Sequence, residues 1–239
     1  MTASESLLPA TDEPVFAAGL LAWPDAPAIR ERWRADGYVA AILDKQRPPE
    51  LPPVLQEEAG SVLNHADPEG YLLRRRAIRA LAGTVTGRAP SAFRIIPSAA
   101  GAPGLAGTGL WISFSGRPPY SAVLIARAPA GIDLEDLIPA DDIPWNILCE
   151  NERSHLQALP PPARGEAFTR LWSAKEAYAK ALGQGFRLPP ESLLVDRNGD
   201  ARFVPAAGQS PLPDGRTRTA KGQTATGKAL IIAMALLSS

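Results

Sequence analysis

The sequence has few of the residues that define several large functional classes. It has one cysteine in 239 residues, Cys149, which excludes a disulfide framework and a cysteine-based structural zinc site. Its two histidines, His65 and His155, lie 90 residues apart, and no G-x-S-x-G motif accompanies them, so a serine-hydrolase triad is not expected. No apolar run approaches the ~20 residues of a membrane span. The best candidate, Ala229–Leu237, reads as a buried strand.

The sequence also lacks a charge excess and a secretory signal. Its 25 basic and 25 acidic residues cancel, which argues against a protein that binds nucleic acid over its whole surface. The first residues, MTASESLLPATDEP, have no basic segment followed by an apolar one, so they do not resemble a signal peptide. We therefore expect a cytoplasmic protein with neither membrane nor nucleic acid as a partner.

The zero balance hides an uneven distribution of charge. Residues 70–132 contain eight arginines and no acid, whereas residues 131–152 contain seven acids and no base. This pattern can be ordinary surface composition. It can also place a basic wall for a polyanion opposite carboxylates that hold a divalent cation, a combination suited to a phosphate-bearing substrate.

Apolar spacing and turn residues predict a mixed architecture. We expect helices at 28–33, 71–82 and 163–182, and strands at 15–22, 93–96, 109–114, 121–126, 132–137, 193–196, 201–204 and 229–237. The chain divides into a flexible tail (1–13), an N-terminal half (14–128) and a C-terminal half (129–239), joined near 127–130. The fold class is α+β: a pseudo-dimer of two similar α+β halves with the active site in the cleft between them.

Two segments carry chemistry. In GIDLE (131–135), strand alternation places Asp133 and Glu135 on one face, where two carboxylates repel unless a cation lies between them; an edge strand with its acids in solvent is the alternative. In AFTRLWSAKEAYAKALGQG (167–185), helical stepping places Lys175 inside an apolar stripe. A buried ammonium needs a partner such as a phosphate, although its stem can also extend to water. Glu176 and Lys180 form either part of this site or an ordinary surface pair.

These two segments resemble the signature pair of the 4′-phosphopantetheinyl transferases, written G-[IV]-D-x-E and [WF]-x-x-K-E-[AS]-x-x-K. The surfactin-synthetase-activating type, with both halves on one chain, is the most similar, and this resemblance implies a monomer. The likeness extends to RRAIR (75–79), GAPGL (101–105), LWISFSG (110–116) and FRLPPESLLV (186–195), and so covers roughly residues 70–237.

The resemblance implies an activity and roles for individual residues. Such enzymes transfer the phosphopantetheine arm of coenzyme A to a serine of an apo acyl or peptidyl carrier protein, with Mg2+, and release adenosine 3′,5′-bisphosphate. The implied magnesium ligands are Asp133, Glu135 and Glu176. The implied catalytic residues are Glu176, as acceptor of the serine proton, and Lys175, which neutralises the pyrophosphate. The implied coenzyme A contacts are Arg75, Arg79, Gly101, Pro103, Ser113, Phe114, Arg117, Lys175 and Lys180.

Two positions depart from the family pattern. Phe114 replaces the histidine that usually contacts the 3′-phosphate of coenzyme A, and Ala102 replaces a lysine. A relative that binds coenzyme A or a carrier protein without transfer is therefore the alternative. A more remote alternative is a phosphotransferase built on GQTATGK (222–228), but Ala229 follows this near P-loop where a Ser or Thr is needed.

Overall fold

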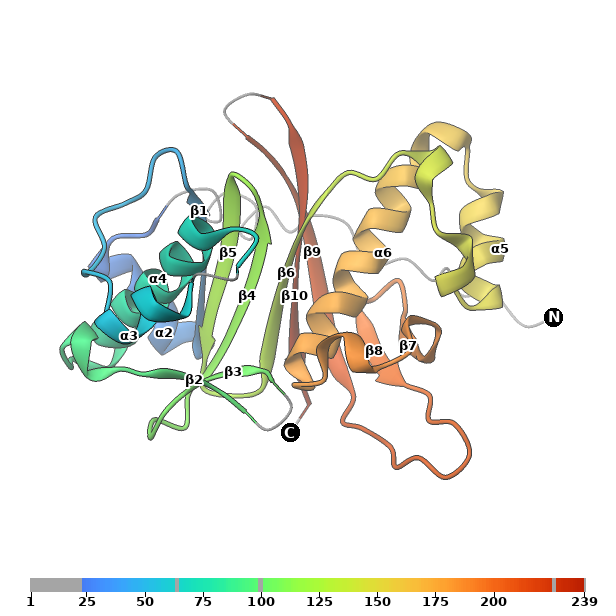
Figure 1. The fold of residues 1–239 in the computed structure, drawn as a ribbon. Helices are drawn as coiled ribbons and strands as arrows, with labels where there is room; N and C mark the ends of the chain where they lie inside the picture. The colour runs from blue at the N-terminus through green and yellow to red at the C-terminus, as the bar shows by residue number, and fades with distance from the viewer. Residues whose placement is uncertain (1–22, 63–64, 99–100, 225–226, 239) are drawn as a thin grey trace.

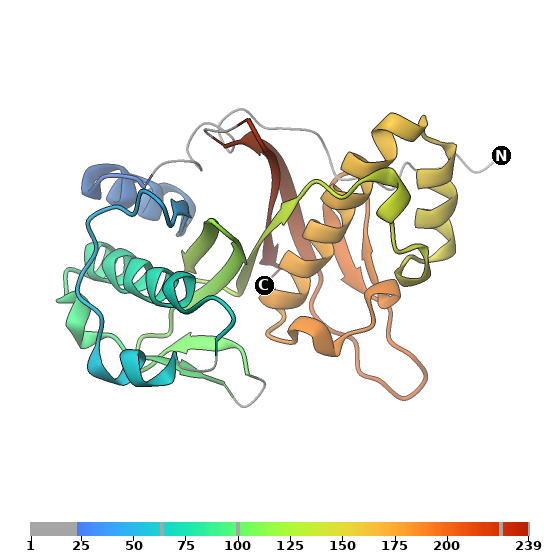
Figure 2. The ribbon, with the colours of Figure 1, turned by 45° about the horizontal axis from the view of Figure 1, so that its top comes forward.

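Two antiparallel five-stranded sheets form the centre of the molecule, and helices cover their outer faces (Figures 1 and 2). The computed structural model describes residues 23–62, 65–98, 101–224 and 227–238. The tail expected over 1–13 and the strand expected over 15–22 lie outside the described residues. The α+β class is confirmed.

The first sheet and its helices occupy residues 26–126. The helices are α2 (Ala26–Asp36), α3 (Gln56–Ser61) and α4 (Pro68–Thr86). The strands are β1 (Tyr38–Asp44), β2 (Ile95–Pro97), β3 (Pro103–Leu105), β4 (Trp111–Arg117) and β5 (Tyr120–Ala126), arranged in the order β1-β5-β4-β3-β2.

The second sheet and its helices occupy residues 130–237. The strands are β6 (Ala130–Asp136), β7 (Leu193–Val195), β8 (Asp200–Phe203), β9 (Gly215–Gln223) and β10 (Ala229–Leu237), in the order β6-β10-β9-β8-β7. The helices are α5 (Glu150–Ala158) and α6 (Pro161–Ala181). In both sheets the first strand along the chain lies at an edge beside the last, and the chain changes sheet within the predicted joint at 127–130. The division into two domains stays a prediction.

Short 3₁₀ turns complete the secondary structure. They are η1 (Pro90–Ala92), η2 (Ala140–Asp142), η3 (Trp145–Ile147), η4 (Gly185–Arg187) and η5 (Pro190–Ser192). The strand predicted at 93–96 is displaced to β2, because Phe93 caps η1. The prediction missed β1, β3, β9, α3 and α5, whereas the long helix at 163–182 is confirmed as α6, which ends before Gly183 at φ +69°.

Three apolar cores hold these layers together. One lies between the sheets, where alternate side chains of β1, β5, β6 and β10 meet, among them Leu124, Ile132 and Ile232. A second lies between the first sheet and helices α2 and α4, and a third between the second sheet and helices α5 and α6. Ile132 and Leu134 of β6 point into this central core. Asp133 and Glu135, which alternate with them along the strand, therefore face the opposite side, as the alternation predicts.

Helix α6 approaches β6 closely because Gly131 has no side chain. A Cβ at this position would lie 2.0 Å from the carbonyl oxygen of Ala177 and 2.6 Å from the amide nitrogen of Ala181. Both atoms belong to the backbone of α6, so they cannot rotate away. This glycine sets the distance between the strand that carries two acids and the helix that carries the third.

We predict that Gly131→Ala destabilises the protein by about 1–3 kcal/mol or more, since the strand and helix must separate to admit a methyl group. Urea denaturation measures the free energy of unfolding. Gly60→Ala is the matched control, because a Cβ at Gly60 in α3 meets nothing within 4 Å. Equal stability of the two variants would contradict the close approach.

Candidate active site

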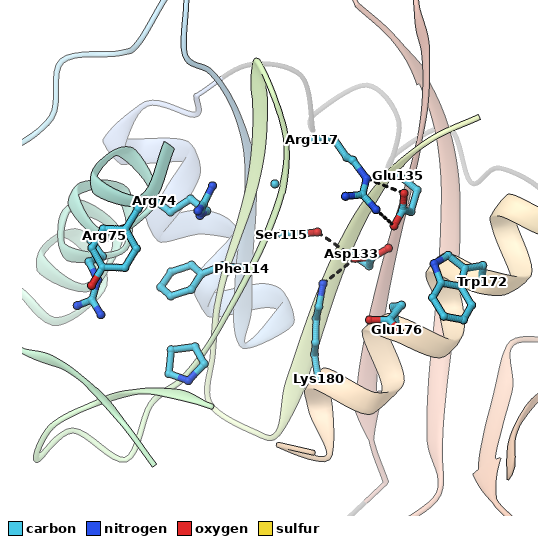
Figure 3. Close-up of a pocket in the computed structure, with 13 residues that line it drawn as sticks. Arg74, Arg75, Phe114, Ser115, Arg117, Asp133, Glu135, Trp172, Glu176 and Lys180 are labelled. Atoms are coloured by element: carbon cyan, nitrogen blue, oxygen red, sulfur yellow. Dashed lines mark hydrogen bonds and ion pairs between the residues drawn. The ribbon is translucent and has the colours of Figure 1, made fainter. Parts of the chain in front are cut away.

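A cavity of about 440 Å³ lies where β4, β6, α4 and α6 meet (Figure 3). Charged side chains of both signs line it. Its cations are Arg74, Arg75, Arg117 and Lys180, and its acids are Asp133, Glu135 and Glu176. The opposition of arginines and carboxylates predicted from the charge distribution is therefore present in one cavity.

Asp133 on β6 is held by donors from both parts of the molecule. Its Oδ1 accepts hydrogen bonds from Ser115 Oγ on β4 at 2.9 Å and from Lys180 Nζ on α6 at 2.6 Å. Its Oδ2 accepts one from Ser173 Oγ at 2.8 Å. Because Asp133 is only 3% exposed, these bonds offset the cost of removing its charge from water.

Glu135, two residues further along β6, forms an ion pair with Arg117 at the end of β4. Nε of Arg117 donates to Oε2 at 2.7 Å, and its Nη2 donates to Oε1. Burial raises the pKa of Glu135, and the guanidinium opposes that rise. The carboxylate in turn raises the pKa of Arg117.

Glu176 on α6 faces the same cavity without a partner of its own. Among the described residues, no hydrogen bond or ion pair reaches its carboxylate, although it is only 7% exposed. Burial raises the pKa of Glu176 to about 7; Lys180 opposes this shift, and the nearby charges of Asp133 and Glu135 add to it. Glu176 is thus the acid in the cavity that is free to take a cation or a proton.

Arg74 and Arg75 of α4 form the opposite wall (Figure 3). Nη1 of Arg74 donates to Ser121 Oγ at 3.1 Å, and Nη1 of Arg75 donates to the carbonyl oxygen of Ile95 at 3.0 Å. The guanidinium of Arg75 also lies 4.6 Å from the ring centroid of Tyr71. Each guanidinium also has an acid behind it, with Asp67 Oδ2 3.7 Å from Nη1 of Arg74 and Glu58 Oε1 3.9 Å from Nη1 of Arg75, while both side chains line the cavity.

A second hollow of about 400 Å³ adjoins the first and shares Pro103, Phe114 and Lys180 with it. The predicted residues Gly101 and Ser113 line this second hollow only. Ser113 Oγ also accepts a hydrogen bond from the amide of Ile132 at 3.0 Å, which joins β4 to β6. The predicted contacts from β4 and from the 101–105 loop therefore fall along one continuous depression.

Two predicted contacts lie elsewhere. Lys175 is 1% exposed, and its Nζ lies 2.6 Å from Oε2 of Glu152 and 2.9 Å from the carbonyl oxygen of Pro190, away from the cavity lining. Arg79 is fully buried, and its Nη2 lies 2.9 Å from Oε2 of Glu58. Acids of the protein supply the partners that burial requires, and neither side chain lines the cavity; their contact with a bound phosphate stays a prediction.

The prediction also missed several lining residues. Tyr71, Arg74, Ser115 and Trp172 line the cavity, and Ser173 orients Asp133 beneath it. Stepping by three and four residues from Arg75 would have placed Tyr71 beside it on one helix face, but nothing local indicates which arginines of 74–79 face outward. Trp172 belongs to the signature motif, but the motif alone does not indicate that its side chain lines the cavity.

Comparisons with known proteins match the segment that carries the acids. Residues 129–223 match the family model of the 4′-phosphopantetheinyl transferase superfamily. This segment of the chain is therefore similar to that superfamily. It is 36% identical over 75 residues to the 4′-phosphopantetheinyl transferase gsp of Aneurinibacillus migulanus. That alignment spans 31% of this chain and 32% of the relative, so the chain covers about a third of the relative's length.

The superfamily segment holds β6, α5, α6 and the strands up to β9. It therefore includes all three acids and Lys180, whereas Arg74, Arg75 and Arg117 come from outside it. Within the part of the chain that the structure describes, no helix has both the length and the apolar composition needed to cross a bilayer.

The donor chemistry of this cavity fits a hard divalent cation. Three carboxylates supply the oxygens that Mg2+ prefers, and Glu176 lies buried beside the like charges of Asp133 and Glu135, with no ion pair of its own to any described residue. Among the described residues, no three acidic, histidine or cysteine side chains converge tightly enough to hold an ion as they stand. Asp133 and Glu135 are instead turned toward Lys180 and Arg117.

We predict that Lys175→Met destabilises the protein by about 3–5 kcal/mol, because it leaves Glu152 buried without a counter-charge. The double variant Lys175→Met/Glu152→Leu removes both charges and should recover most of that loss. Chemical denaturation of the three proteins measures the difference. A single variant as stable as the wild type would show that the pair does not support the fold.

The raised pKa of Glu176 predicts a pH-dependent stability. Between pH 4.5, the ordinary value for glutamate, and about 7, the folded protein keeps a proton that the unfolded chain releases. This stabilisation is complete below the lower value and is lost as pH rises through the upper one. In the presence of a chelator, Glu176→Gln should exceed the wild type in stability by about 3 kcal/mol at alkaline pH, and by little at pH 4.5. Thermal melts across this range test it; a difference that does not vary with pH would refute the shift.

Proposed function

We propose that this protein transfers the 4′-phosphopantetheine arm of coenzyme A to a serine of an apo acyl or peptidyl carrier protein. The observation that supports it best is the opposition, across one cavity, of Asp133, Glu135 and Glu176 to Arg74 and Arg75. Cations on one wall suit a pyrophosphate, and acids on the other suit a divalent metal and a proton acceptor. The superfamily match covers the acids.

The proposed reaction is a phosphoryl-group transfer. The serine oxygen of the carrier attacks the β-phosphorus of the pyrophosphate, and a new P–O bond forms. The bond from that phosphorus to the bridging oxygen breaks, and adenosine 3′,5′-bisphosphate leaves with the bonding electrons. The serine proton passes to the carboxylate of Glu176, the acid of the cavity that has no hydrogen-bond partner among the described residues.

The cations of the cavity position the pyrophosphate and stabilise its developing charge. Arg74 and Arg75 approach it from α4, and Lys180 approaches it from α6. Asp133, Glu135 and Glu176 would hold Mg2+, which supplies Lewis-acid neutralisation of the phosphate oxygens. Lys175 has a structural role in this proposal, because its ammonium group forms a buried ion pair with Glu152.

The shared strand order of the two sheets supports a pseudo-dimer, with the active site between two similar halves. The first half contributes Arg74, Arg75 and Arg117, and the second contributes the acids and Lys180. A cavity lined from both halves can bind a ligand of mixed charge, which neither half would hold alone.

The second hollow would receive the nucleotide end of coenzyme A. Phe114 and Ala102 line it where the family pattern has a histidine and a lysine, and its cations are Lys180 and Arg187. A phenyl ring gives no charge-assisted hydrogen bond to a 3′-phosphate. These replacements predict a weaker affinity for coenzyme A. The internal pairing of Asp133 and Glu135 favours the second candidate function, which is binding of coenzyme A or a carrier protein without transfer.

Mass spectrometry of apo carrier proteins incubated with this protein, coenzyme A and Mg2+ tests the proposal. We expect the carrier to gain one phosphopantetheine. Asp133→Asn should lower the transfer rate by about 100-fold or more, because it removes a charged group from the proposed metal site. Chelation of the metal should have the same effect.

Asp136→Asn is the matched control. Asp136 ends the same strand, but its carboxylate pairs with Lys228 and lies outside the cavity lining. It should transfer at the wild-type rate. Coenzyme A binding without any mass gain across acyl and peptidyl carriers would favour the non-catalytic function. Transfer by Asp133→Asn at the wild-type rate would refute the assigned site.

A further inference from the structure

The ion pair between Arg117 and Glu135 occupies the cavity at the position where the proposed metal would bind. The guanidinium meets both oxygens of the carboxylate, one of them at 2.7 Å, in the two-pronged geometry that makes arginine–carboxylate pairs strong. The two residues come from different sheets, β4 and β6 (Figure 3). Glu135 is buried, whereas the side chain of Arg117 is 44% exposed.

A metal ion cannot use Glu135 in this arrangement without displacing Arg117. Both carboxylate oxygens already accept hydrogen bonds, and among the described residues no three candidate ligands converge on one point. The half-exposed guanidinium is the partner able to leave, because its long side chain can turn toward the cavity while Glu135 stays fixed on its strand.

The charges of the cavity determine when this exchange is favourable. The four cations and three acids that line the cavity give it a formal charge of +1. Asp67 and Glu58, which lie behind Arg74 and Arg75, do not change this balance, because Lys45 and Arg79 pair with them at shorter range. A divalent ion alone raises it to +3 and releases Arg117 with no new partner. A diphosphate that enters with the ion offsets this excess and offers its oxygens to the released guanidinium.

We propose that Arg117 is an internal counter-ion that moves from Glu135 to a substrate phosphate when a divalent cation binds. Cation and diphosphate then bind cooperatively, and each tightens the other's affinity by the same factor. Arg117 is a positioning residue in this scheme, since it acts on the metal site through Glu135. The inference rests on the proposed function for its ligand, but its test measures binding and not transfer.

Titration of the metal-free, full-length protein with Mn2+, followed by electron paramagnetic resonance, tests the inference. In the wild type, coenzyme A should tighten Mn2+ binding at least about fivefold. Arg117→Gln should bind Mn2+ alone about fivefold more tightly than the wild type, because the competing guanidinium is gone. In the same variant, coenzyme A should tighten Mn2+ binding by a smaller factor than in the wild type, because there is no guanidinium that could move to the phosphate.

Two further variants make the result specific. Arg117→Lys keeps the charge but cannot bind both carboxylate oxygens at once, so its Mn2+ affinity should fall between those of the wild type and Arg117→Gln. If Arg117→Gln does not fold, the comparison of Arg117→Lys with the wild type takes its place. Arg216→Gln removes an arginine that pairs with Asp200 outside the cavity, and should leave Mn2+ binding unchanged.

Unchanged or weaker Mn2+ binding in Arg117→Gln would overturn the inference, as would wild-type Mn2+ binding that is independent of coenzyme A. Failure of the proposed function gives a different pattern. If no carrier gains phosphopantetheine while coenzyme A still tightens Mn2+ binding through Arg117, the counter-ion stands and the transfer does not.

Discussion

Asp133 lies at 3% exposure on the strand where the two sheets meet, and a carboxylate at that depth is unfavourable unless donors surround it. Its donors come from three places: Ser115 on the first sheet, and Ser173 and Lys180 on two turns of α6. Satisfying this one charge therefore fixes β4, β6 and α6 relative to one another. The cavity that these elements line is a consequence of that requirement, together with the close helix–strand approach at Gly131.

The charged side chains around the cavity divide into those that are neutralised within the fold and those that can still bind a ligand. Lys175 and Arg79 are committed, because each is buried against an acid of the protein, Glu152 or Glu58. Arg74 and Arg75 line the cavity and are paired only at longer range, 3.7 Å from Asp67 and 3.9 Å from Glu58, and the Glu176 carboxylate faces them across the cavity. A ligand of mixed charge, such as a metal–diphosphate, is complementary to the second group. The proposed transfer therefore depends on charged side chains that the fold does not need for its own stability.

Local periodicity was enough to predict β6, α6 and the common direction of Asp133 and Glu135. Each depends only on the spacing of side chains along one element, which repeats about every 2 residues in a strand and about every 3.6 in a helix. The partners of Lys175 and Arg79 were not predictable: they lie 23 and 21 residues away, and a buried cation looks the same in a sequence whether an acid or a phosphate neutralises it. Strand β9 was missed because Gly215, Thr217 and Thr219 fill its buried positions in place of large apolar residues.

The central claim is that one ligand bridges the acids of β6 and α6 and the arginines of α4. A crystal structure of the protein with coenzyme A and Mn2+, with the metal located by anomalous scattering, tests it most directly. The account predicts Mn2+ bound by Asp133, Glu135 and Glu176 at about 2.1–2.2 Å, with the pyrophosphate between the metal and the guanidinium groups of Arg74 and Arg75. A metal bound away from these acids, or a pyrophosphate that contacts neither arginine, would contradict it.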